Sequence, residues 1–86
     1  SVIKTGTVSE LKIYPNPTQN SIIVELQHNE IKNASIQVID LLGKTHLQQK
    51  VSSQQTTIDL SNFSIGIYIV KFTNHLGSKA IKVVKE

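Results

Sequence analysis

Residues 66–85 read GIYIVKFTNHLGSKAIKVVK, and this stretch decides the fold class of the chain. β-Branched and aromatic side chains alternate through residues 67–73, as in a strand with one buried face. Residues 74–77 predict a hairpin turn in which Gly77 takes a positive φ, and residues 78–85 return antiparallel. We therefore predict a β-hairpin whose first strand is central in its sheet.

Five further segments show the same alternation between turn residues. We expect strands at 11–14, 21–26, 34–40, 45–51 and 56–60, and the polar segment 45–51 suits a sheet edge. Together with the hairpin they predict an all-β fold, a seven-stranded antiparallel β-sandwich of the immunoglobulin-like type.

A chain of 86 residues fits one small domain. We expect residues 1–10, which are rich in Ser, Thr and Gly, to be a linker, and residues 11–86 to be the folded domain. The first residue is not Met, so we expect the chain to have been cut from a longer protein. No apolar run reaches the about 20 residues of a membrane-spanning helix and no secretory signal opens the chain, so we expect no membrane insertion.

Composition argues against several classes of protein. The chain has no cysteine, which excludes disulfides, thiolate metal ligands and cysteine nucleophiles. Its net charge is +3 and all nine basic residues are lysines, with no Trp beside them. Nucleic-acid readers use Arg for bidentate contacts and aromatic rings for stacking, so we expect no nucleic-acid partner.

Residues that carry catalysis are sparse. Three histidines, His28, His46 and His75, fall in a predicted loop, an edge strand and a turn, and we interpret them as exposed polar residues rather than metal ligands or catalytic groups. The chain contains no nucleophile elbow, paired-histidine zinc motif or phosphate-binding loop. We expect no enzymatic activity and no cofactor.

Two carboxylates, Asp40 and Asp59, each end a predicted strand. Together with Asn62 and backbone carbonyls, these carboxylates could supply the oxygen ligands of a Ca²⁺ site. The interpretation that we favour is that each caps the following turn through nearby backbone N–H groups.

Lysines cluster in the last hairpin at Lys71, Lys79, Lys82 and Lys85, which predicts a basic edge at the carboxyl end. Edge lysines commonly serve only to prevent aggregation between sheet edges. A docking surface is the alternative.

Four motifs then occur in order: YPNPT at 14–18, DLLGK at 40–44, GIYIV at 66–70 and KAIKVVK at 79–85. In this order and spacing they resemble the type A C-terminal sorting domain of the bacterial type IX secretion system. The resemblance covers residues 11–86.

The resemblance implies a seven-stranded sandwich at the carboxyl end of an exported cargo protein. A signal peptide brings such a cargo to the periplasm, and the outer-membrane translocon then recognises the sorting domain. A sortase-like cysteine peptidase usually removes the domain, and the cargo is released or joined to anionic lipopolysaccharide at the cell surface. Residues 1–10 would then lie near the cleavage region, next to the upstream cargo.

Matching positions give two sets of candidates. The resemblance implies translocon recognition by Gly66, Tyr68, Lys82, Val84 and Lys85. It implies structural roles for Pro15, Asn16, Pro17 and Gly43, and we expect Asp40 and Gly77 to be structural as turn residues. Two departures are Phe63, where Leu is commoner, and Glu86, which adds a negative charge at the docking end.

A recognition mechanism can be stated for the last hairpin, residues 66–85, whose edge and basic end the receptor would meet by strand pairing and charge. Deleting residues 82–86 is then expected to abolish export without unfolding the domain.

The main alternative function is a carbohydrate- or surface-binding module of a secreted enzyme, and a structural spacer or adhesion domain comes third. Sugar sites usually offer exposed aromatic rings. The four aromatic residues are Tyr14, Phe63, Tyr68 and Phe72, and we expect all of them in the core.

Overall fold

The computed structural model describes residues 11–27 and 30–86 and contains seven strands. The strands are β1 (Lys12–Tyr14), β2 (Ser21–Glu25), β3 (Ala34–Asp40), β4 (Thr45–Val51), β5 (Gln55–Asp59), β6 (Gly66–Asn74) and β7 (Gly77–Lys85). Each predicted strand is present, and its ends differ by at most one residue from the prediction. The predicted linker at residues 1–10 and the predicted loop histidine His28 lie outside the described residues.

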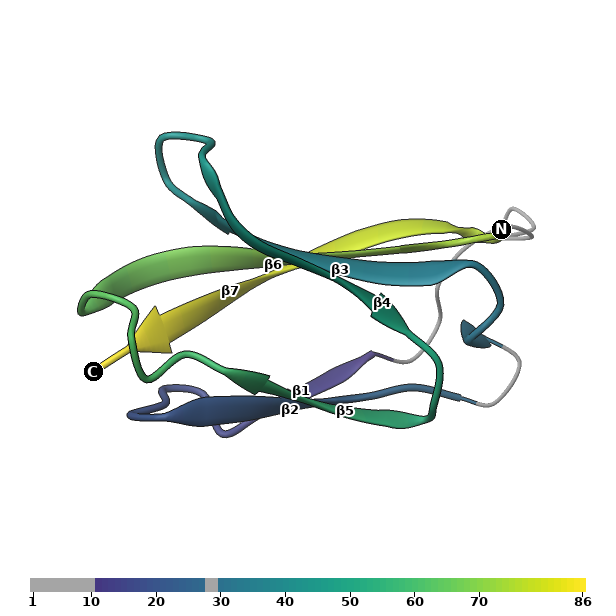
Figure 1. The fold of residues 1–86 in the computed structure, drawn as a ribbon, viewed down its shortest axis with the longest axis horizontal. Coiled ribbons are helices and arrows are strands. Elements are labelled where there is room, and N and C mark those ends of the chain that lie inside the picture. Colours follow the sequence, from purple (N-terminus) through teal and green to yellow (C-terminus); the bar gives the residue numbers. More distant parts are fainter. Residues whose placement is uncertain (1–10, 28–29) are drawn as a thin grey trace, which may run out of the picture.

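The strands form two antiparallel sheets (Figure 1), one of three strands in the order β1-β2-β5 and one of four in the order β4-β3-β6-β7. This confirms the all-β class and the antiparallel pairing. β6 lies between β3 and β7 and is central, whereas β4 is an edge strand, both as predicted. The carboxyl end of the chain leaves from β7, which is the other edge of the four-stranded sheet.

The two sheets face each other across one apolar core, to which both contribute. Ile22 and Ile58 come from the three-stranded sheet, Ile36 and Phe72 from the four-stranded one, and each is at most 1% exposed. Alternate residues point inward because the side-chain period of a strand is two.

The prediction for one aromatic residue is wrong. Tyr14 is 38% exposed on the three-stranded sheet, where its hydroxyl lies 3.5 Å from Glu25 Oε1. Phe72 and Tyr68 are buried as predicted, and Phe63 packs half-buried against the core. One alternation in a three-residue edge strand is too little to fix which face is inward.

Polar side chains fix both turns of the four-stranded sheet. In the β6–β7 turn, Asn74 Oδ1 accepts hydrogen bonds from the N–H groups of Leu76 at 2.9 Å and Gly77 at 3.2 Å, and Gly77 has φ +143°. In the β3–β4 turn, Gly43 has a positive φ of +89°, and its N–H donates to the Asp40 carbonyl at 3.0 Å.

We expect Gly43→Val to lower the free energy of unfolding by about 1–2 kcal/mol, because a β-branched residue disfavours a positive φ. Among the described residues no atom lies within 4 Å of the position that a Cβ would take, so the cost comes from the backbone and not from a clash. Denaturant melts measure the difference. Gly43→Asn is the control and should be affected less, since Asn tolerates positive φ; equal melts for the wild type and both variants would contradict the prediction.

Candidate functional site

The segment Pro15–Pro17 contacts the last strand through the Asn16 side chain. Its Nδ2 donates to the Lys82 carbonyl at 2.8 Å, and its Oδ1 accepts from the Val84 N–H at 3.1 Å. One side-chain amide therefore makes the two bonds that a neighbouring strand would make with the edge of β7. Residues far apart in the sequence are joined in this way.

Thr18 continues this contact toward the carboxyl end. Its N–H donates to the Val84 carbonyl at 2.9 Å, and its carbonyl accepts from the Glu86 N–H at 2.7 Å. A parallel bridge joins Thr18 to Lys85, and Thr18 is only 2% exposed. We call residues 15–18 and 82–86 together the terminal edge.

The terminal edge corrects two predictions. The last hairpin does not present an open edge along its whole length, since residues 15–18 are already hydrogen-bonded to the edge of β7 at residues 82–86. Deleting residues 82–86 would also remove Val83, which is fully buried. The deletion would damage the core, so the expectation that it spares the fold is wrong.

Lys85 does not belong to an exposed basic edge as predicted. It is 6% exposed, and its Nζ donates to the Phe63 carbonyl at 3.2 Å. Lys85 lies two residues after Val83, so the alternation of β7 turns it toward the core, and its charged end is held by a carbonyl of the β5–β6 connection. Lys71, Lys79 and Lys82 are exposed as predicted.

The remaining recognition candidates surround Lys85. Gly66 pairs directly with Lys85 across β6 and β7, and Tyr68 pairs with Val83. Tyr68 is 6% exposed and donates its hydroxyl to the Ser64 carbonyl at 2.8 Å. Tyr68 and Lys85 therefore bind consecutive carbonyls of the β5–β6 connection, those of Ser64 and Phe63.

Of the five recognition candidates, Lys82 alone has an exposed side chain, and Val84 and Gly66 are half-buried. The structure thus brings Pro15, Asn16 and Pro17, which the resemblance implied to be structural, into one region with the residues implied for recognition. Sequence reasoning missed this because no local pattern connects the two segments.

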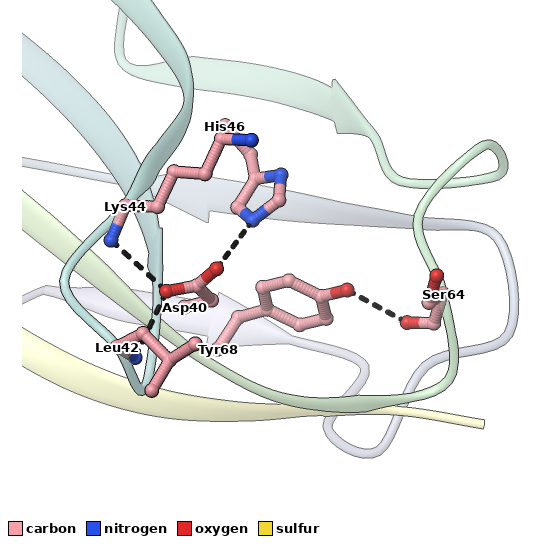
Figure 2. A network of polar contacts seen from close by, with 6 residues as sticks. All are labelled: Asp40, Leu42, Lys44, His46, Ser64 and Tyr68. Atoms are coloured by element: carbon pink, nitrogen blue, oxygen red, sulfur yellow. Dashed lines mark hydrogen bonds and ion pairs between the residues drawn. The ribbon is translucent and has the colours of Figure 1, made fainter.

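A network of polar contacts around Asp40 holds the β3–β4 turn (Figure 2). Asp40 Oδ1 accepts from the N–H groups of Leu42 and Lys44, both at 2.9 Å, and Asp40 Oδ2 lies 2.8 Å from His46 Nε2. The His46 bond, followed by the Lys44 N–H, holds the pKa of the Asp40 carboxyl below its ordinary value. Turn capping by Asp40 is confirmed.

His46 is exposed as predicted, and its ring also packs on two aromatic rings. The ring centroids lie 5.6 Å from Phe63 and 5.7 Å from Tyr68, with Tyr68 edge-on. A register shift in the β3–β4 pairing between Val38 and Ile39 accompanies this placement. His75, in the β6–β7 turn, is exposed and its Nδ1 lies 3.2 Å from the Lys32 carbonyl.

Asp59 also caps a turn. Its Oδ1 accepts from the Ser61 N–H at 2.9 Å, and bonding by Ser61 lowers the pKa of the Asp59 carboxyl. Both carboxylates that suggested a Ca²⁺ site are therefore engaged in turns. Across residues 11–27 and 30–86, no group of three or more His, Asp or Glu residues is placed to hold a metal ion.

These two carboxylates predict acid sensitivity. A lowered folded-state pKa means that each carboxyl stabilises the fold above its ordinary pKa and loses this contribution as the pH falls through the folded value. We expect the melting temperature of the wild type to fall as the pH drops below about 4, the ordinary pKa of an Asp carboxyl. The double variant Asp40→Asn/Asp59→Asn keeps the side-chain oxygens that cap the turns, and its melting temperature should fall less over the same pH range. Parallel profiles for the two proteins would refute this.

Asn16→Leu should lower the free energy of unfolding by about 1–2 kcal/mol, because both side-chain bonds to β7 are lost. Asn16→Asp keeps the acceptor for the Val84 N–H but places a carboxylate oxygen against the Lys82 carbonyl, so it should cost at least as much. The exposed neighbour Gln19→Leu is the control and should change stability by less than about 0.5 kcal/mol. Denaturant melts measure the series, and Asn16→Leu melting like the Gln19 control would show that the amide does not secure the edge.

Comparisons with known proteins bear on this region. A family model described as a secretion system C-terminal sorting domain matches residues 12–86, which include the whole terminal edge. No curated protein matches the chain. In the described part of the chain, no helix is long and apolar enough to cross a membrane.

Proposed function

Because the chain belongs to the family of secretion system C-terminal sorting domains, the type IX family that its motifs resembled, we propose that it directs an attached cargo across the outer membrane through the type IX translocon. Membership implies that the domain is part of a cargo precursor, interacts with the secretion machinery, and is secreted to the cell surface or the extracellular space. The cargo would pass through the periplasm, and a sortase-like peptidase would then remove the domain.

The match over residues 12–86 is the observation that carries the proposal. The terminal edge adds a physical reason, since it fixes the carboxyl end in one conformation that a receptor can read. Within it, Lys82 and Val84 would contact the receptor. Gly66, Tyr68 and Lys85 would hold β7 and the β5–β6 connection in place. We further propose that the two facing sheets are an immunoglobulin-like sandwich.

A reporter export assay tests the proposal. A fluorescent protein with a signal peptide is fused ahead of residues 1–86 and expressed in a type IX-competent host and in its translocon-deficient derivative. We expect reporter outside the cell only when the translocon is intact. Folded reporter that stays in the periplasm of both strains would refute the proposal.

The exposed Tyr14 favours a second candidate function, binding of a carbohydrate. Gln55 Nε2 lies 3.4 Å from the Tyr14 hydroxyl and 3.3 Å from Glu25 Oε2, so a ring and polar groups share one surface. The shallow groove beside β4, lined by Asn33–Ser35 and Gln48–Ser52, offers no aromatic residue among the described ones. Binding to a glycan array that is lost in Tyr14→Ala would support this function. An array on which the wild-type domain binds no glycan would refute it.

A further inference from the structure

The outer face of the four-stranded sheet carries charge of one sign. Directly opposed residues of neighbouring strands share a face, so the register places Lys71 beside Gln37 and Lys82 beside Ile69 on this side. Lys50, opposite Ser35, completes it. These three lysines are exposed, and among the residues of β3, β4, β6 and β7 that point outward there is no carboxylate. We call this side the basic face.

Apolar side chains occupy the end of the basic face that lies nearest the carboxyl terminus. Ile39, Ile69 and Lys82 stand in one row across β3, β6 and β7. Ile67 and Val84 form the next row, and Val84 is bonded to Asn16 in the terminal edge. Lys82 therefore borders an apolar strip that spans three strands and consists of Ile39, Ile67, Ile69 and Val84.

Of the large apolar side chains that are exposed among residues 11–27 and 30–86, most lie at the same end. Leu41 is 66% exposed, Leu42 94%, Ile65 79% and Ile67 38%. Leu41 and Leu42 sit in the β3–β4 turn, which projects on the side away from the three-stranded sheet (Figure 1), and Ile65 directly precedes β6. Exposed apolar side chains that gather at one place and have charges at their margin mark an interaction surface.

We propose that the basic face binds an acidic protein surface with an apolar centre on the secretion machinery, with Lys71 and Lys82 at the rim and Ile67 and Leu42 in the contact. The proposal rests on the proposed function and names the surface that performs it. Charge complementarity favours an acidic partner, since the chain has a net charge of +3 and the basic face contributes only positive charge.

The composition of the face favours a protein over a lipid surface. Proteins that lie in a membrane interface usually present an amphipathic helix or Trp and Tyr side chains at the headgroup level. The chain has no Trp, and its two tyrosines lie on the opposite sheet and in the core. A sheet face with aliphatic side chains and separate lysines fits a protein partner better.

Binding of the domain, residues 1–86, to the detergent-purified type IX outer-membrane translocon tests the proposal by biolayer interferometry. We expect Lys71→Glu/Lys82→Glu to weaken binding at least about tenfold, mainly through slower association. The matched control is Lys12→Glu/Lys32→Glu, two exposed lysines elsewhere, which should stay within about twofold of the wild type. Ile67→Thr should weaken binding without changing its salt dependence. Circular dichroism melts verify that each variant is folded.

The outcomes separate two failures. If Lys71→Glu/Lys82→Glu and the control variant both bind the translocon as well as the wild type does, the basic face is not the binding surface. The proposed sorting function would be unaffected. A wild-type domain that neither binds the translocon nor exports the reporter would refute the proposed function itself. Binding to phosphatidylglycerol vesicles that Lys71→Glu/Lys82→Glu abolishes, with no binding to the translocon, would assign the face to a membrane and overturn the protein partner.

Discussion

Phe72→Ala is expected to lower the free energy of unfolding by about 3–5 kcal/mol, since it removes a fully buried aromatic ring and leaves a cavity. Phe72 lies in the central strand β6 and is paired with Ile36 of β3 and Lys79 of β7. A domain of 86 residues has a total stability of about 4–13 kcal/mol, so this loss is a large part of it. Thermal melts should show a fall of at least about 12 °C.

The control for this prediction is Thr73→Ala, the next residue along β6, which is exposed on the outer face and should change stability by less than about 0.5 kcal/mol. Both variants also enter the export assay. We expect the Phe72 variant to lose export and the Thr73 variant to keep it. Wild-type export by an unfolded Phe72 variant would show that the machinery reads a linear peptide and not the folded terminal edge.

The strand pattern was predictable because the strands follow a period of two along most of their length and turn residues separate them. The segments 34–40 and 45–51 match β3 and β4 at both ends, and alternation placed Val70 and Phe72 in the core as observed. The exposed Tyr14 was not predictable, because β1 has only three residues at the edge of its sheet.

The candidate site was less predictable because its contacts join distant parts of the chain. The two Asn16 hydrogen bonds span 66 and 68 positions, and no local rule connects a turn near the start with the last strand. His46 lies beside a register shift that a sequence pattern does not reveal. Its contacts with Phe63 and Tyr68 therefore follow only from the folded chain.

The inward position of Lys85, unlike the contacts of Asn16 and His46, could have been predicted from the sequence. Ile81, Val83 and Lys85 follow each other at a period of two, and the first two are apolar, so the pattern alone turns Lys85 toward the core. The charge of the side chain instead suggested an exposed position. The long apolar stem of lysine resolves the conflict, because it packs inward while the Nζ reaches the Phe63 carbonyl at 3.2 Å.

Two substitutions at Lys85 separate a structural role from direct recognition. Lys85→Met keeps the apolar stem and loses one hydrogen bond, so it should lower the free energy of unfolding by about 1 kcal/mol. Lys85→Glu places a carboxylate next to the Phe63 carbonyl oxygen in a site that is 6% exposed, and we expect a loss of about 3 kcal/mol. Denaturant melts give both values.

Export of the two variants decides what the ammonium group does. If Lys85 positions β7 against the β5–β6 connection, the folded Met variant should export within about twofold of the wild type, while the Glu variant should fail because its terminal edge is disrupted. A Met variant that is folded and stable but not exported would show that the Nζ itself contacts the receptor. In that case the Phe63 carbonyl must release the side chain on binding, and Lys85 would join Lys82 as a contact residue.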